Sequence, residues 1–277
     1  MSEVAVLLTC FNRREKTLAC LQRLFILRRD LDVFLVDDSS TDGTGNAVAE
    51  LFPQVQVIQG NGALFWNRGM YLAWSVAAKR GYRYYLWVND DVVVYEHCLG
   101  ELFECVSVCQ DRAVLVGLVD AGDGQAIYGG TDSAGRLLQP NGEMQEVYHM
   151  NGNVVLVPAQ VFDIVGNLDP VYHHDLGDVD YGYRARAQGL SVVTSKSFVA
   201  RGEKNDFCRI RLWGSDLRAR FRRLYSPLGN PPTINFYFRR KHKGVVNAVV
   251  YYMFIHLINI APDWVVRLVY GNRYIGA

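Results

Sequence analysis

Short apolar runs alternate with helix-like patterns over the first ninety residues of the chain. Each run is too short for a helix and ends in polar residues or glycine, which is typical of a buried strand that ends in a loop. The runs lie at residues 4–8, 33–36, 55–58 and 84–88. The helices expected between them lie around 18–27, around Ala47 and Val48, and over 66–80. This alternation predicts right-handed βαβ units and a parallel sheet that binds ligands beyond the carboxyl ends of its strands.

After about residue 111 the strand-like runs no longer alternate regularly with helices. The elements expected there are strands at 114–119 and 154–157, hairpins within 122–142 and a helix at 178–188 closed by Gly189. The pattern predicts an α/β fold with a mostly parallel, Rossmann-like nucleotide-binding sheet and a mixed second half. We expect a catalytic domain at 1–208, divided at about residue 110, and a helical region at 209–277.

Charge is divided unevenly along the chain, although the formal net charge is only +1. Residues 1–208 hold 17 Lys and Arg against 26 Asp and Glu, whereas residues 209–277 hold 12 against 2. A basic tail on an acidic body indicates a separate task for the tail. The first apolar run is short, and basic residues follow it rather than precede it. We therefore expect no signal peptide and a cytoplasmic protein.

The tail combines basic clusters with one strongly apolar stretch. Arginine and lysine crowd positions 218–223 and 239–243, and the apolar, aromatic stretch 245–260 follows. This stretch is shorter than the roughly 20 residues that span a bilayer. It fits a helix in a membrane interface, and equally a helix packed on the catalytic body or in a homodimer contact. The apolar stretch and the acidic body argue against a nucleic-acid partner.

Two pairs of adjacent acids follow predicted strands, so they are expected at one edge of the sheet. Asp90-Asp91 comes after the fourth strand. Adjacent carboxylates need a nearby positive charge, and a divalent cation with oxygen ligands would supply it. Asp37-Asp38 ends the second strand, where a carboxylate can accept hydrogen bonds from ribose or base. The alternatives are a solvated turn for the later pair and a helix cap for the earlier one.

A third polar cluster lies at or near the start of the helix expected at 178–188. Asp178 stands where an anion is favoured, and it could deprotonate an acceptor hydroxyl as a general base. Alternatively Asp178 caps the helix, and Asp180 pairs with Arg184 four residues later. His173 and His174 are candidate metal ligands or acceptor contacts, with a structural role as the favoured alternative.

In this order the segments resemble the family 2 glycosyltransferases of the GT-A fold, especially bacterial rhamnosyltransferase-like members. The matching text is LLTCFNR (7–13), VDDSSTDGT (36–44), GNG (60–62), WNRG (66–69), NDD (89–91), NG (151–152) and GDVD (177–180), with Arg184 and Gly189. No single segment is specific, but their order and approximate spacing hold over about residues 4–200.

The resemblance implies roles for individual residues. Those implied to bind the donor are Thr9, Phe11, Asn12, Asp38, Asn67, Arg68 and Asp90. Asn151 and Gly152 are implied on the acceptor side, where we also expect His173, His174 and Asp180. Asp91 would be the direct ligand of a divalent cation, Mg²⁺ or Mn²⁺. Asp178 matches the catalytic base of inverting members.

Two departures from the family pattern weaken the expected metal site. The family commonly has Glu where this chain has Gly177, so a carboxylate beside Asp178 is missing. The family often has a late histidine that helps to bind metal, but residues 197–203 contain none. Arg201 would then meet the diphosphate directly, or His173 or His174 would substitute.

These observations predict an inverting glycosyltransferase. It would move a sugar from a nucleoside-diphosphate sugar to a hydroxyl of a saccharide or lipid-linked acceptor, in the synthesis of bacterial surface polysaccharide. A sugar-nucleotidyltransferase is one alternative, but it would need a glycine-rich loop after the first strand, and residues 9–12 contain no glycine. A non-catalytic nucleotide-sugar-binding protein is the other, and it would not hydrolyse its donor.

Overall fold

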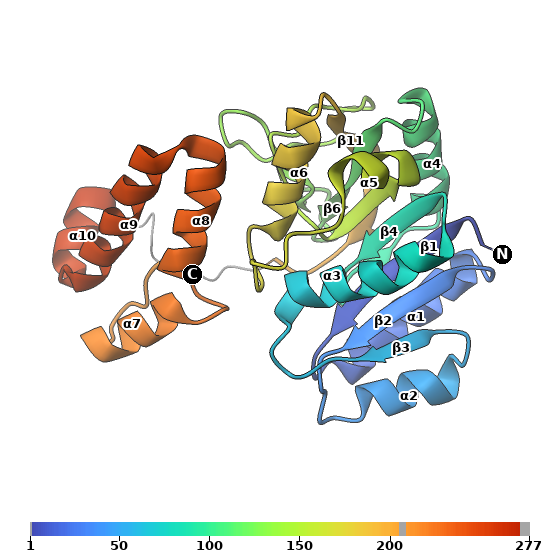
Figure 1. Ribbon diagram of the computed structural model, residues 1–277, viewed down its shortest axis with the longest axis horizontal. Coiled ribbons are helices and arrows are strands. Elements are labelled where there is room, and N and C mark those ends of the chain that lie inside the picture. The colour runs from blue at the N-terminus through green and yellow to red at the C-terminus, as the bar shows by residue number, and fades with distance from the viewer. Residues whose placement is uncertain (1, 205–208, 272–277) are drawn as a thin grey trace. The chain divides into compact units, whose positions relative to one another are not determined.

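The structure is a computed structural model that describes residues 2–204 and 209–271. The chain divides into two compact units (Figure 1). Unit 1 comprises residues 2–173 and 177–204, and unit 2 comprises residues 174–176 and 209–271. The boundary expected between residues 208 and 209 adjoins residues 205–208, which lie outside the described residues, as do residues 272–277 of the expected tail. The expected domain limits therefore stay a prediction.

Unit 1 contains, within the described residues, one sheet of nine strands in the order β3-β2-β1-β4-β10-β6-β11-β5, with β7 beside β6. Its strands are β1 (Val4–Cys10), β2 (Asp32–Asp37), β3 (Gln56–Gln59), β4 (Tyr84–Val88), β5 (Val93–Val94), β6 (Ala113–Asp120), β7 (Ala126–Tyr128), β10 (Val154–Pro158) and β11 (Ser191–Arg201). A separate two-stranded sheet pairs β8 (Gly130–Thr131) with β9 (His149–Met150).

The pairing confirms a mostly parallel sheet with a mixed second half. β1 runs parallel to both β2 and β4, and β2 runs parallel to β3. β10 is antiparallel to its neighbours β4 and β6, whereas β6 and β11 are again parallel. Because β1, β2 and β4 are parallel neighbours, the loops that follow their carboxyl ends meet at one edge. The hydrophobic pattern does not indicate β11, because its middle, residues 194–197, is polar. The pairing of β11 with β6 is also irregular there.

Helices cover both faces of this sheet (Figure 1). They are α1 (Arg14–Leu27), α2 (Thr44–Leu51), α3 (Phe65–Ala77) with a 3₁₀ turn at Ala78–Arg80, α4 (Cys98–Val108), α5 (Ala159–Val165) and α6 (Gly177–Ala187). Helices α1, α2 and α4 share a buried core with Val4, Val6 and Leu8, and α3, α5 and α6 share one with Ala5 and Leu7. Successive residues of β1 thus point to opposite faces, which is the period of a strand buried on both sides.

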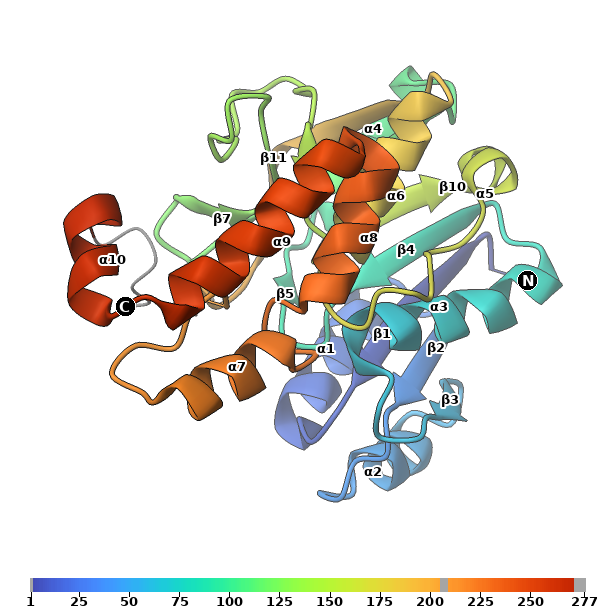
Figure 2. The ribbon, with the colours of Figure 1, turned by 60° about the vertical axis from the view of Figure 1, so that its left-hand side comes forward.

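Unit 2 is helical. Its helices are α7 (Leu217–Tyr225), α8 (Pro232–Lys243), α9 (Val245–Ile260) and α10 (Asp263–Tyr270). Helices α8 and α9 join through Gly244 and pack side by side (Figure 2). The buried Arg211 and Arg220 donate to the carbonyl oxygen of Ala261, after the C-terminus of α9, at 2.8 and 3.1 Å, and both pair with Asp263. Cations are favoured at a helix C-terminus, so part of the tail's positive charge is structural.

Candidate active site

The loops after β1 and β2 are bound to each other at the carboxyl edge of the sheet. The backbone N–H of Asn12 donates to the Ser40 hydroxyl at 2.9 Å, and the Asn12 amide oxygen accepts from the Thr41 N–H at 2.7 Å. Asn12 has φ 52, a left-handed conformation that asparagine tolerates better than most residues. The side chain of Asn12 therefore holds the loop, and any contact with a nucleotide would be additional.

Asp38, at the end of β2, is saturated by backbone donors. Its carboxylate accepts from the N–H groups of Gly62, Leu64 and Phe65 at 2.7, 2.9 and 3.0 Å. Three such bonds fix the loop between β3 and α3 and place the first turn of α3. A residue that the sequence predicts as a nucleotide contact is thus also the main organiser of this loop.

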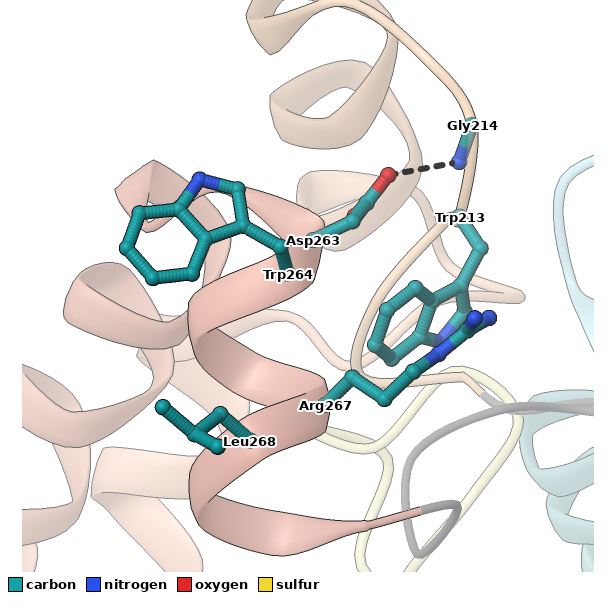
Figure 3. A pocket seen from close by; sticks show the side chains of 6 residues that line it. All are labelled: Trp213, Gly214, Asp263, Trp264, Arg267 and Leu268. Atoms are coloured by element: carbon teal, nitrogen blue, oxygen red, sulfur yellow. Dashed lines mark hydrogen bonds between the residues drawn. The ribbon is translucent and has the colours of Figure 1, made fainter.

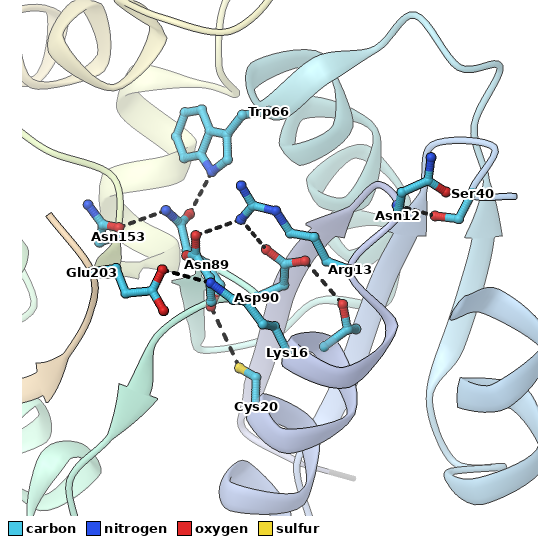
Figure 4. A network of polar contacts seen from close by, with 12 residues as sticks. Asn12, Arg13, Lys16, Cys20, Ser40, Trp66, Asn89, Asp90, Asn153 and Glu203 are labelled. Atoms are coloured by element: carbon cyan, nitrogen blue, oxygen red, sulfur yellow. Dashed lines mark hydrogen bonds and ion pairs between the residues drawn. The ribbon is translucent and has the colours of Figure 1, made fainter. Parts of the chain in front are cut away.

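The second acidic pair, Asp90-Asp91, binds side chains instead. Arg13 Nη1 lies 3.3 Å from Asp90 Oδ1 and 2.5 Å from Asp91 Oδ2, and the Thr17 hydroxyl donates to Asp90 at 3.1 Å (Figure 4). Asp90 is buried, and burial raises its pKa to about 6 although the neighbouring guanidinium opposes that shift. The positive charge that the adjacent carboxylates need is supplied here by Arg13.

A chain of amide hydrogen bonds leads from the acidic pair toward the acceptor-side residues (Figure 4). Asn89 accepts from Trp66 Nε1 and donates to Asn153, both at 2.7 Å. Asn153 in turn donates to the side chain of Asn151. The predicted acceptor-side residue Asn151 is therefore connected to the loop that carries Asp90.

Asp178, in the first turn of α6, is held by backbone donors on both carboxylate oxygens. Oδ2 accepts from the Gly152 N–H at 2.9 Å, and Oδ1 accepts from the Val179 N–H at 2.8 Å. A Cβ at Gly152 would lie 2.5 Å from the Trp66 ring and 3.3 Å from the Asp178 Cβ, so only glycine lets these groups approach. The structure thus brings Gly152 and Asp178 together, as the ordered motifs imply, and adds the ring of Trp66.

Helix α6 is held in place by the packing of Tyr181, three residues after Asp178. Tyr181 is completely buried, and its ring centroid lies 5.4 Å from that of Trp74 and 5.2 Å from that of Trp87. This aromatic packing holds the first turn of α6 on a rigid base. A carboxylate presented from such a helix keeps its position better than one on a free loop.

Asp180 is engaged within the same helix. Its carboxylate is 0% exposed, pairs with Arg184 Nε at 2.7 Å and accepts from the Tyr172 hydroxyl at 3.0 Å. The alternative interpretation of the sequence, an ion pair four residues apart, is confirmed. The expectation that Asp180 contacts the acceptor finds no exposed surface to support it, because the partners of its carboxylate cover it.

Polar side chains at the start of α3 form hydrogen bonds with the loop before α6. The buried Asn67 amide donates to the carbonyl oxygens of Asp169 and Tyr172, both at 2.9 Å, and Arg68 Nε donates to that of Pro170 at 2.8 Å. A Cβ at Gly177 would meet the Asn67 side chain at 1.7 Å. A glutamate at position 177, as in the family pattern, has no room, because Asn67 fills that space.

The remaining predicted residues are less closely connected to this network. Phe11 is 52% exposed after β1, and Thr9 is half-buried within β1. Burial lowers the pKa of His173, with a further contribution from the charge of Arg68. Arg201 ends β11 opposite Val93 of β5. His174 belongs to unit 2, so its place relative to this site stays a prediction.

The acidic pair offers the oxygen donors that Mg²⁺ and Mn²⁺ accept. Within the described part of the chain, no three His, Cys, Asp or Glu side chains converge on one point. A donor set of two carboxylates fits a cation that takes its other ligands from a diphosphate and water. Such binding requires the Arg13 guanidinium to leave Asp91 Oδ2 or to share it.

Two residues of this network, Arg13 and Trp66, are not singled out by the sequence reasoning. Arg13 has a signal in the sequence, because it follows the strand that pairs with β4 and so lies at the same edge as the acids. The sequence signal for Trp66 is weaker, because an aromatic residue at the start of a helix usually belongs to the hydrophobic core.

Comparisons with known proteins bear on the family and the fold of the chain. The model of the family described as glycosyl transferase family 2 matches residues 5–160. No curated protein matches the chain. The S. aureus TarS fragment 1–349 in complex with UDP-GlcNAc is similar at 15% identity and a TM-score of 0.58, over 97% of this chain and 84% of that one. The Pyrobaculum calidifontis mannosyltransferase PcManGT with GDP-Man and Mn²⁺ is similar at 15% identity and a TM-score of 0.55, over 97% and 79%. At such identities the structural likeness shows the GT-A fold alone.

Proposed function

Because the chain belongs to glycosyl transferase family 2 and is a glycosyltransferase, we propose that it transfers a sugar with inversion from a nucleoside-diphosphate sugar to a hydroxyl. The observation that carries this proposal is the position of Asp178. It is a carboxylate on a rigid helix start, joined through Gly152 and the amide chain to the acidic pair. A base and a diphosphate-binding pair on opposite sides of one site are what a single displacement at an anomeric carbon requires.

Donor binding is assigned to the loops at the carboxyl edge. The exposed ring of Phe11 would stack on the base, and Asp38 would add a ribose or base contact to its structural role. Asp91, with Asp90 beside it, would hold a divalent cation that offsets charge on the departing diphosphate. The TarS structures with UDP and UDP-GlcNAc and the PcManGT structure with GDP-Man and Mn²⁺ support a donor of this class.

Arg13 would take a second position when the donor is bound. Its guanidinium lies on the carboxylates that face the diphosphate, and a guanidinium binds phosphate oxygens through two parallel hydrogen bonds. Arg201, at the end of β11, and Arg68 are further candidates for the diphosphate. Cations on the leaving group lower the barrier, because negative charge develops there in the transition state.

The acceptor is assigned to the opposite side of the site. Asp178 would take the proton of the acceptor hydroxyl as its oxygen attacks the anomeric carbon. Gly152 and Trp66 would shape the space in front of that carboxylate, because the Gly152 N–H donates to it and the Trp66 ring lies against Gly152. We propose a saccharide or lipid-linked saccharide as acceptor, in cytoplasmic synthesis of surface polysaccharide; the basic tail suits an acceptor presented at an anionic surface.

The test is Asp178→Asn, assayed with donor and acceptor. The substitution keeps the size of the side chain but removes its basicity, so turnover should fall about 10²–10⁴-fold. Asp163→Asn, the same change on the exposed side of α5, is the matched control and should leave turnover unchanged. Near wild-type turnover by Asp178→Asn, with the product unchanged, would remove Asp178 from the role of base.

A further inference from the structure

Helix α9 presents a continuous apolar stripe to solvent. Its members are Val246, Val250, Met253, Leu257 and Ile260, all between 54 and 75% exposed. Their spacing of four and three residues keeps them on one side of the helix over its whole length. The opposite side is used within unit 2, where Ala248, Ile255 and Ile258 are buried. An exposed apolar stripe of this length marks a surface that binds something.

Helix α10 adds a second exposed apolar group. Trp264 is 70% exposed and Leu268 is 79% exposed, and they lie four residues apart. Figure 3 shows both side chains projecting from the same side of α10, whereas Arg267 turns toward Trp213. Tryptophan is enriched at membrane–water interfaces, because it joins a large apolar ring to one polar N–H.

Exposed cations lie on the two helices that precede α9 in the chain. Arg240 and Lys243, in the last turn of α8, are exposed and precede the first turn of α9 across Gly244. On α7, Arg218 and Arg222 are exposed four residues apart. Residues 209–271 contain only two acids, Asp216 and Asp263. The first caps α7 and the second is paired with Arg211 and Arg220, so the outward charge of this unit is strongly positive.

We propose that the face formed by the α9 stripe, Trp264 and Leu268, together with the cations of α7 and α8, binds the surface of an anionic lipid bilayer. Lipid acyl chains would cover the apolar stripe, and lipid phosphates would meet the cations beside it. A second copy of this face would cover the stripe but would bring cations against cations. No helix within residues 2–204 and 209–271 combines the length and the hydropathy of a membrane span.

This inference does not rest on the transfer reaction, because its test needs no sugar substrate. The full chain is mixed with vesicles of phosphatidylcholine alone or in equal mixture with phosphatidylglycerol, and binding is measured by flotation. We expect binding to the mixed vesicles that weakens as salt rises and is much weaker on phosphatidylcholine alone. Arg240→Gln and Lys243→Gln should each weaken binding about fivefold, since one cation at an anionic surface contributes about that factor.

The apolar stripe is tested by Val250→Asp combined with Leu257→Asp, which should abolish flotation. Trp264→Ser is a second, milder variant should the double variant fail to fold, and it should weaken binding severalfold. Ile26→Asp on α1 places the same kind of change on an exposed apolar side chain of unit 1, and it should bind as the wild type does.

Three outcomes would overturn the proposal. In the first, the wild-type chain does not float with anionic vesicles at low salt. In the second, the stripe variants float as well as the wild type. In the third, sedimentation equilibrium shows a wild-type dimer that the stripe variants lose, without any lipid binding. That result would assign the face to a second copy, while donor hydrolysis by the same preparations reports separately on the transfer reaction.

Discussion

The two acidic pairs of this protein look alike in sequence but differ in what their carboxylates bind. Asp38 directly follows β2 and accepts from three backbone N–H groups, so its carboxylate orders a loop. Asp91 follows β4 and pairs with the end of a long side chain, the guanidinium of Arg13. Backbone donors cannot move away without unfolding the loop, whereas a guanidinium can exchange with another cation.

This difference separates an acid that mainly orders a loop from one that a metal ion can use. A carboxylate saturated by the backbone stabilises the fold but has little left to offer a metal. A carboxylate held by an exchangeable cation keeps its site open to a cation of another kind. We propose that the pair in the loop after β4 is the functional one, and each substitution below either breaks this contrast or sharpens it.

The largest effect is expected for Asp91→Asn. Loss of one charge at the diphosphate should lower turnover about 10²–10³-fold, in the range seen when a group that stabilises transition-state charge is removed. The free energy of unfolding should change by less than about 1 kcal/mol, because Asp91 forms a partly exposed ion pair. Turnover and urea unfolding of the same preparation measure both. If the variant unfolds so easily that lost stability explains the lost turnover, Asp91 has a structural role like that of Asp38.

Asp38→Asn should lower the free energy of unfolding more than Asp91→Asn does. Asparagine has one acceptor oxygen in place of two and turns an N–H₂ group toward backbone donors, so at least one buried donor is left unpaired. The free energy of unfolding should fall by about 2–4 kcal/mol. Urea unfolding measures it, with Asp163→Asn as the matched control. A fully stable Asp38→Asn variant would contradict the structural role.

Asp90→Asn tests the buried member of the functional pair through pH. Burial raises the pKa of Asp90 from 3.8 to about 6, so the folded state binds more protons than the unfolded state between these values. Stability conferred by the protonated group is therefore lost as pH rises through about 6. The variant should gain about 1–3 kcal/mol over the wild type at pH 7.5 and nothing at pH 4. An equal gain at both pH values, by urea unfolding, would contradict the raised pKa.

The smallest effect is expected for Arg13→Gln in the absence of donor. Removing the guanidinium from Asp91 should increase the affinity for Mn²⁺ up to about fivefold, the value of an exposed ion pair. Manganese binding can be followed by electron paramagnetic resonance. Lys16→Gln removes an equal charge three residues later, on α1, where Lys16 pairs with the exposed Glu203, and serves as control. A lower affinity in Arg13→Gln alone would show that Arg13 supports the metal rather than competing with it.

Much of the fold could be predicted from the sequence, because strands buried on both faces leave continuous apolar runs. β4 and α9 have the bounds that their hydrophobic patterns predict. β11 could not be predicted, because a polar segment interrupts it where its pairing with β6 becomes irregular. Short β5 likewise has too few residues to form a pattern.

The candidate site was predictable in its residue types and order but not in its pairings. Sequence spacing allows an ion pair between Asp180 and Arg184, because both lie on one helix. It does not show that Arg13 meets Asp91, because that contact joins segments 78 residues apart. The sequence also does not explain why position 177 is glycine instead of the family's glutamate. The Asn67 side chain fills the space, and it comes from another helix.

The most direct test of glycosyl transfer from a nucleotide sugar is a screen of the purified full chain against nucleoside-diphosphate sugars. Release of nucleoside diphosphate is measured with and without Mn²⁺, before any acceptor is known. The account predicts slow release from at least one donor, with loss of that release in Asp91→Asn and its retention in Asp163→Asn. No release from any donor, together with no donor binding by calorimetry, would contradict it.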